Sequence, residues 1–214
     1  MSTNIQIYYL LPQNLKKYID RMGIDLDISV REGNLTIVNL KNEIKNQPDF
    51  CRNEESISFT HFLSLLYSDI ILYAVIEEKI VGALSFMFIE KNDDKIINFN
   101  GICSPIKYSG LGVGQELINT LIRIGKNNDI KYISLECNEN MVKYYRDKFG
   151  FTVESTKMIY DSDDSDNEDG DSYYNMILDL STVSGGRKIK RKNKKSIKKQ
   201  IKKRSRRTRR KLRK

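Results

Sequence analysis

The chain has 214 residues, of which 39% are hydrophobic, and a formal net charge of +9, which is enough for one sizeable domain with an extension. Residues 185–214 carry 19 of the 37 Lys and Arg residues and no acidic residue, which leaves 18 basic and 28 acidic side chains elsewhere, a net charge of −10. No signal-peptide pattern opens the chain, and its longest apolar run, Ile70–Ile76, is too short to cross a bilayer. The sequence therefore predicts an intracellular protein, nuclear or cytoplasmic, without a transmembrane segment.

The first third of the chain mixes clear and ambiguous patterns. The segment IQIYYL at 5–10 predicts a strand, and residues 12–22 predict a helix with Pro12 in its first turn. Residues 24–58 give no decisive periodicity. A second helix is expected at 59–69, because its apolar side chains recur at helical spacing.

Three apolar segments follow, at residues 71–76, 80–90 and 95–103. Their connections, EEK at 77–79 and KNDD at 91–94, are short and polar. This spacing predicts an antiparallel β-meander.

The rest of the folded part predicts, in order, a helix, a strand, a helix and two strands, at residues 114–126, 131–137, 138–149, 150–160 and 172–181. Asn138 is the expected N-cap of the second of these helices. A strand, a helix and a strand in succession predict one parallel pair within an otherwise antiparallel sheet. The expected fold class is α/β of the α+β type, a mixed, mostly antiparallel central sheet with helices on both faces.

Three glycines at alternate positions, Gly110, Gly112 and Gly114, stand at the start of the helix predicted at 114–126. The first turn of a helix has free backbone N–H groups and the positive end of the helix dipole. Glycines there let a phosphate reach these groups without meeting a Cβ atom. A tight turn from strand to helix, with no ligand, is the alternative interpretation.

Other phosphate-binding patterns fit less well. A dinucleotide-binding fold needs G-x-G-x-x-G and a second βαβ half, whereas the spacing here is G-x-G-x-G after antiparallel strands. Glu136 stands where such a fold would place its ribose-binding acid, but too little chain follows. A Walker loop is excluded, because no Gly-Lys-Ser/Thr follows.

The segment GICSPIKYSGLGVGQELINTLI, followed by ISLECNENMVKYYRDKFGF, resembles the GNAT superfamily of acetyl-CoA-dependent N-acetyltransferases. The resemblance covers about residues 70–180 and implies a GNAT-like fold, acetyl-CoA as co-substrate and no metal. It implies that the glycine-rich loop holds the pyrophosphate and that the preceding strand pairs with the pantetheine arm through its backbone. The cofactor-binding residues so implied are Ile102, Cys103, Ser109, Gly110, Leu111, Gly112, Val113, Gly114, Gln115 and Asn138.

The resemblance also implies direct attack of an amine on the thioester. Tyr145 is expected to protonate the departing thiolate, with Tyr144 as the alternate; a core aromatic is the competing interpretation. An amine of the lysine type is almost wholly protonated at pH 7, so the site needs a base. Glu136 is the candidate, because no carboxylate lies inside the strand IINFNGIC. His61, the only histidine, is far from both motifs in sequence and is expected to be an ordinary helix residue.

The three cysteines, Cys51, Cys103 and Cys137, are far apart and lack a CxxC spacing. This spacing argues against a disulfide framework or a zinc site, and it suits a reducing compartment. Cys103 and Cys137 fall at strand ends near the predicted cofactor. We expect both to be small buried side chains, because the mechanism needs no thiol nucleophile.

Residues 1–183 are predicted to form the GNAT-like domain, and residues 184–214 a disordered basic tail. The charge of 187–214 predicts binding to nucleic acid through phosphates, with nuclear targeting, an anionic membrane and a solubilising extension as alternatives. Such a tail is similar to those of large DNA virus proteins, which would allow a place in a virion. The acidic loop at 161–171 holds seven carboxylates and predicts attraction of a basic acceptor, either a basic protein or a polyamine.

Two functions are open at this point. One is an N-acetyltransferase for a primary amine of a protein lysine, a protein N-terminus or a small polyamine, which the three glycines, Asn138 and Tyr145 favour. The other is a catalytically inactive GNAT-scaffold protein that binds nucleic acid through its tail. Ser109 stands where the family usually has Arg or Gln, and this favours the second.

Overall fold

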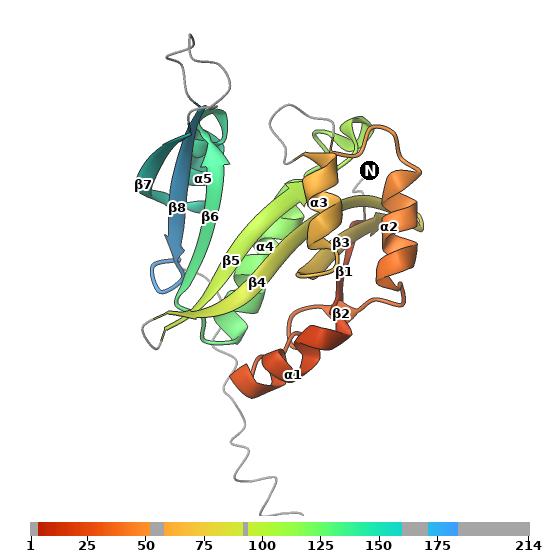
Figure 1. Ribbon diagram of the computed structural model, residues 1–214, viewed down its shortest axis with the longest axis horizontal. Coiled ribbons are helices and arrows are strands. Elements are labelled where there is room, and N and C mark those ends of the chain that lie inside the picture. The colour runs from red at the N-terminus through yellow and green to blue at the C-terminus, as the bar shows by residue number, and fades with distance from the viewer. Residues whose placement is uncertain (1–3, 52–57, 92–93, 160–170, 184–214) are drawn as a thin grey trace, which may run out of the picture. The chain divides into compact units, whose positions relative to one another are not determined.

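The computed structural model describes residues 4–51, 58–91, 94–159 and 171–183 (Figure 1). The chain divides into two units, Met1–Val183 and Ser184–Lys214, and the second lies outside the described residues. Most of the acidic loop, residues 161–170, lies outside them too. The domain boundaries, the basic tail and the acidic loop therefore stay predictions.

One sheet runs through the first unit, with the strand order β2-β1-β3-β4-β5-β6-β8-β7. Its strands are β1 (Gln6–Leu10), β2 (Arg31–Glu32), β3 (Ile70–Ile76), β4 (Lys79–Lys91), β5 (Asp94–Cys103), β6 (Tyr132–Asn138), β7 (Thr152–Ile159) and β8 (Asp171–Asp179). The helices of the described residues are α1 (Gln13–Met22), α2 (Ile37–Lys45), α3 (Phe59–Leu65), α4 (Val113–Asn127) and α5 (Glu139–Phe149), with a short 3-10 turn, η1 (Ile106–Tyr108).

The sheet is mixed and mostly antiparallel, as predicted. Strands β3, β4 and β5 form the antiparallel meander, and β5 and β6 form the predicted parallel pair. A second parallel pair, β1 with β2, was not predicted, because β2 is short and lies in the segment whose sequence gave no clear period. The fold class expected from the sequence is confirmed.

Helices cover both faces of this sheet, which was also predicted. One core gathers apolar residues of α1, α4 and α5, with Ile19, Leu117 and Phe149 as examples. The other gathers residues of α2 and α3, with Leu40 and Phe62 fully buried. Two faces with separate cores require helices on both sides, because an apolar sheet face exposed to water is unfavourable.

A glycine on β4 sets how closely α4 approaches the sheet. A Cβ atom built on Gly82 would stand 2.6 Å from Val113 Cγ1 and 3.3 Å from Leu117 Cδ1. Any larger residue at this position would push the first turn of α4 outward. Gly82 therefore fixes the place of the glycine-rich loop that precedes α4.

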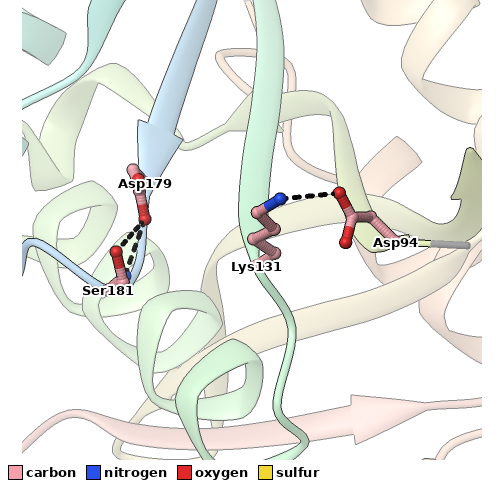
Figure 2. Close-up of polar contacts among 4 residues, drawn as sticks. All are labelled: Asp94, Lys131, Asp179 and Ser181. Atoms are coloured by element: carbon pink, nitrogen blue, oxygen red, sulfur yellow. Dashed lines mark hydrogen bonds and ion pairs between the residues drawn. The ribbon is translucent and has the colours of Figure 1, made fainter. Parts of the chain in front are cut away.

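Polar contacts secure the chain where β5 and β6 begin and where β8 ends (Figure 2). The Lys131 ammonium lies 2.8 Å from Asp94 Oδ2, and its hydrogen bond to that carboxylate raises the pKa of Lys131. Ser181 donates to Asp179 Oδ1 from its hydroxyl at 2.6 Å and from its backbone N–H at 2.8 Å. These two hydrogen bonds lower the pKa of Asp179.

The structure contains a disulfide between Cys51 and Cys103, whose Cα atoms are 4.9 Å apart. The expectation that the cysteines form no disulfide is therefore wrong for this pair. The two cysteines are 52 residues apart, so their spacing in the sequence did not indicate a contact. The contact arises because a β-bridge pairs Phe50 with Pro105. Cys137 is buried and not in a disulfide, as expected, and burial, followed by the charge of Glu136, raises the pKa of its thiol to about 11.

Candidate active site

Strands β5 and β6 pair over only four residues and then part, which forms a fork. The last pair is Phe99 with Leu135, and beyond it β6 continues beside β8. Figure 1 shows β6, β8 and β7 diverging from β5. Asn100 is skipped in the pairing of β5 with β4, a bulge that bends β5 where it leaves β6. Residues 100–102 therefore have β4 on one side and no strand of the described chain on the other.

The glycine-rich loop leaves several amides at the start of α4 without an acceptor in the described residues. Helix α4 has no side-chain cap at its N-terminus. Within residues 109–115, the N–H groups of Ser109 and Leu111 donate to nearby backbone carbonyls. The other five N–H groups have no acceptor among the described residues. The five N–H groups belong to Gly110, Gly112, Val113, Gly114 and Gln115. Unpaired amides at the positive end of a helix are what an anion needs.

Glycine is required in this loop by the backbone itself. Gly110 and Gly112 have φ values of 80° and 78°, a region that residues with a Cβ atom rarely adopt. No atom lies within 4 Å of a Cβ built on either residue. The loop is therefore open where a side chain would stand. The phosphate interpretation and the tight-turn interpretation both fit these amides, because the first N–H groups of any helix lack a partner within the helix.

The other predicted cofactor residues lie around the fork and the loop. Ile102 faces the start of α4, with its Cδ1 atom 3.6 Å from a Cβ built on Gly114. The Cys103 side chain is only 2% exposed and turned into the core beside α3, so its sulfur is unavailable to a ligand. Asn138 is the N-cap of α5, as predicted, because its Oδ1 accepts from the Met141 N–H at 3.2 Å. Its NH₂ group donates to no described residue.

The aromatic ring of Tyr145 packs beneath the point where β5 and β6 part. Its ring centroid lies 6.1 Å from that of Phe99 and 5.8 Å from that of Phe151, both edge-on. Tyr145 is 5% exposed, and burial raises the pKa of its hydroxyl, with smaller contributions from Cys137 and Tyr144. Tyr145 thus lies in the core and keeps its proton at neutral pH, and the two interpretations of this residue are compatible.

A groove of about 770 Å³ lies on the α3 side of the fork. Glu136 lines it at the open end of the fork and forms an ion pair with Lys157 at 3.2 Å. His61, which sequence spacing placed far from both motifs, lines the same groove from α3. The groove has the volume of a small-ligand site, and it borders the fork at Phe99 and Leu135, the last pair before the strands part.

The floor of the groove carries polar side chains that sequence reasoning missed. Asn98, Asn100 and Ser134 line it, and Asn100 donates a hydrogen bond to the buried carboxylate of Asp69. The available signal was two asparagines flanking Phe99 inside an otherwise apolar strand. Asp69 gave a weaker signal, as the acid just before a run of seven apolar residues.

Two features are absent from the described residues. No group of three or more His, Cys, Asp or Glu side chains among them is arranged to hold a metal ion. In the same part of the chain, no helix is long and apolar enough to cross a membrane.

Residues 38–151, more than half of the chain, match the acetyltransferase (GNAT) family. The chain belongs to this family. The match includes the glycine-rich loop, the fork and α5, whereas β7 and β8, which also line the groove, lie outside it.

Solved structures of other acetyltransferases share this GNAT fold. The Escherichia coli ribosomal-protein-S18-alanine N-acetyltransferase matches with a TM-score of 0.53 at 14% identity, over 73% of this chain and 96% of that one. Arabidopsis thaliana Naa50, in complex with the bisubstrate analogue CoA-Ac-MVNAL, matches with a TM-score of 0.50 at 17% identity, over 68% of this chain and 95% of that one. An IAA acetyltransferase from Bacillus cereus matches with a TM-score of 0.50 at 11% identity, over 82% of this chain and 99% of that one. Identities this low show the shared fold alone.

Proposed function

We propose that the protein transfers the acetyl group of acetyl-CoA to a primary amine by direct attack. The observation that carries this proposal is the set of unpaired amides from Gly112 to Gln115, at the start of a helix beside an open strand edge. These amides would hold the pyrophosphate of the coenzyme. The edge of β5 at residues 100–102 would pair with the pantetheine arm, since it has no strand on that side.

Acetyl-CoA supplies an activated thioester, and the residues around the fork supply proton transfer and positioning. A backbone N–H group on the free edge of β5 would stabilise the oxyanion. Glu136, at the open end of the fork, is the proposed acceptor of the amine proton. Tyr145, whose raised pKa keeps it protonated at neutral pH, is the proposed donor to the departing thiolate.

The acceptor is proposed to be a peptide or polyamine amine that enters through the groove on the α3 side. Two proteins with this fold have names or ligands that point to protein N-termini, the S18-alanine acetyltransferase and Naa50 with its peptide analogue. Glu154 also lines the groove and forms no ion pair with the described residues. An unpaired carboxylate favours a cationic acceptor.

Calorimetry with acetyl-CoA tests the proposal first, and mass spectrometry tests turnover. The acceptor panel would hold the peptide MVNAL, an Nα-blocked lysine peptide and spermidine. We expect saturable acetyl-CoA binding and acetylation of at least one acceptor, with a rate proportional to enzyme concentration. Absence of acetyl-CoA binding at high micromolar concentration would contradict the proposal.

Residues 187–214 are proposed to bind nucleic acid through their positive charge. They lie outside the described residues, so this proposal rests on composition, as do the cellular location and the likeness to viral proteins. A gel-shift series from 50 to 200 mM salt would test it, because counterion release predicts about a thousandfold loss of affinity over this range. A chain ending at residue 183 is the control.

A further inference from the structure

Asp69, just before β3, is the only Asp or Glu among the described residues whose side chain is buried, at 3% exposure. Its Oδ1 accepts from the Ser68 hydroxyl at 2.8 Å, and its Oδ2 accepts from Asn100 Nδ2 at 2.6 Å. It forms no ion pair with the described residues. A carboxylate is costly to bury without a charged partner, so its place under the groove calls for an explanation.

The carboxylate fixes the direction of a whole chain of hydrogen bonds. The NH₂ group of Asn100 faces Asp69 and donates to its Oδ2 atom. The Asn100 oxygen therefore faces Asn98 and accepts from Asn98 Nδ2. The Asn98 oxygen then faces Ser134 and accepts from its hydroxyl at 3.1 Å. Every donor in this chain points toward Asp69.

The direction of these hydrogen bonds determines whether Ser134 can donate or accept a hydrogen bond in the groove. The single hydroxyl hydrogen of Ser134 is directed at Asn98 Oδ1, and the carbonyl of Ile97, at 3.5 Å, is a longer alternative on the same side. The lone pairs that are left on Ser134 Oγ can only accept a hydrogen bond. Polarisation along the chain makes this oxygen a stronger acceptor.

These hydrogen bonds lie at the fork, where β5 and β6 part. Asn98 and Ser134 are paired in register, one pair before the strands separate at Phe99 and Leu135. Asn98, Asn100 and Ser134 all line the groove. The Ser134 oxygen therefore faces the groove opposite Asn98, two residues before the start of the β5 edge that is proposed to hold the thioester.

We propose that Asp69, acting through Asn100 and Asn98, orients Ser134 so that its oxygen accepts a hydrogen bond from the primary amine of the acetyl acceptor. Asp69 and the two asparagines are positioning residues, and Ser134 is the one that touches the amine. The inference rests on the proposed acetyl transfer and adds the site of the amine group. It assigns this site to side chains that no motif in the sequence marks.

Kinetics of Ser134 and Asp69 variants test the inference, with spermidine and the peptide MVNAL as acceptors. Ser134→Ala removes the oxygen, and we expect the KM for the amine to rise about tenfold, which is the effect of one lost hydrogen bond. Ser134→Thr keeps a hydroxyl and is expected to keep most of the affinity. The KM for acetyl-CoA should stay unchanged in both, which a general disturbance of the fold would not allow.

Asp69→Asn loses the fixed direction of the hydrogen bonds but keeps the shape of the side chain. We expect a rise in amine KM of about fivefold, and no further rise when Asp69→Asn is added to Ser134→Ala, because both act through one oxygen. Asp20→Asn, on the exposed surface of α1, is the matched control. Effects that simply multiply in the double variant would overturn the proposal.

A binding experiment that needs no turnover keeps the test independent of the acceptor. Full-length protein labelled with ¹⁵N-asparagine is titrated with n-butylammonium, and the side-chain NH₂ signals of Asn98 and Asn100 are followed by NMR. We expect both signals to shift in a saturable way in the wild type and much less in Ser134→Ala. Unshifted wild-type signals, or equal shifts in the variant, would overturn the proposal.

The two proposals fail in different ways. If acetyl-CoA does not bind, the acetyl-transfer function fails, while the n-butylammonium titration still decides whether the site takes an amine. If acetyl-CoA binds and acetylation occurs, but amine KM is unchanged in Ser134→Ala and Asp69→Asn, the function stands and the amine site lies elsewhere in the groove.

Discussion

Asn98 on β5 and Ser134 on β6 face each other in register and are joined by a 3.1 Å hydrogen bond, one residue pair before their strands separate. The end of the main-chain pairing and this side-chain hydrogen bond therefore lie at the same point of the sheet. On the opposite face of the same point, Tyr145 packs edge-on against Phe99. The fork thus carries a polar surface, proposed to receive the acceptor, on one face and a proposed proton donor on the other.

Tyr145→Phe tests the proton donor. Because general acid catalysis typically contributes at least a hundredfold, we expect kcat to fall by about this factor. Acetyl-CoA affinity should change little, since the ring packing is retained. Tyr144→Phe is the matched control, and calorimetry together with steady-state kinetics separates binding from turnover. Equal losses in the two variants would show that the hydroxyl of Tyr145 has no special role.

The same residue gives a prediction for stability at high pH. Burial raises the pKa of Tyr145 above its value of about 10 in the unfolded chain. Above pH 10 the unfolded chain loses this proton while the folded protein keeps it, so the free energy of unfolding falls as pH rises. Urea unfolding at pH 10 and pH 11 should show a decline that is smaller in Tyr145→Phe by about 1 kcal/mol, because half of the unfolded chains have already lost this proton at pH 10. The same slope in both proteins would contradict the predicted shift.

Two variants of Gly112 distinguish the effect of backbone strain on stability from the effect of an added Cβ atom on ligand binding. Its φ of 78° disfavours alanine, so Gly112→Ala should lower stability by about 1–2 kcal/mol. Gly112→Asn should cost less, since asparagine tolerates this conformation and no atom stands within 4 Å of the new Cβ. Both variants should weaken acetyl-CoA binding, because either Cβ meets the incoming phosphate. Wild-type affinity in Gly112→Asn would place the anion elsewhere.

The disulfide can be tested by removing it. Cys51 and Cys103 close a loop with a sequence separation of 52 residues, and loop-closure entropy predicts a loss of about 4 kcal/mol on removal. Chemical unfolding of Cys51→Ser with and without reductant would measure this loss. Reductant should lower the stability of the wild type and leave that of the variant unchanged. Mass spectrometry of the purified protein shows directly whether the bond has formed.

Ser85 on β4 is the one described residue whose buried side-chain oxygen lacks a hydrogen-bond partner. Burying an unpaired hydroxyl is unfavourable, so Ser85→Ala should raise the free energy of unfolding by about 1 kcal/mol. Thr120→Val is the contrasting variant, because Thr120 Oγ1 accepts from Arg123 at 3.0 Å. It should lower stability or leave it unchanged. A destabilised Ser85→Ala protein would mean that the hydroxyl is satisfied in solution.

Much of the fold was predictable because its causes are local. The apolar stripe of α4, the cap at Asn138 and the short turns of the meander each depend on residues a few positions apart. The glycine-rich loop was predictable for the same reason, since a backbone with positive φ at Gly110 and Gly112 favours glycine.

The hydrogen-bonded side chains of the proposed amine site and the disulfide could be found only from the tertiary structure. Asp69 reaches Asn100, and Asn98 reaches Ser134, only through the register of strands that are far apart in sequence and the bulge at Asn100. Cys51 meets Cys103 through a single β-bridge. Sequence by itself determined most of the helices and strands outside residues 24–58 and the glycine-rich loop before α4, because these follow from short-range spacing. Which side chains meet across the sheet depended on register, and a shift of one residue would turn each of them to the opposite face.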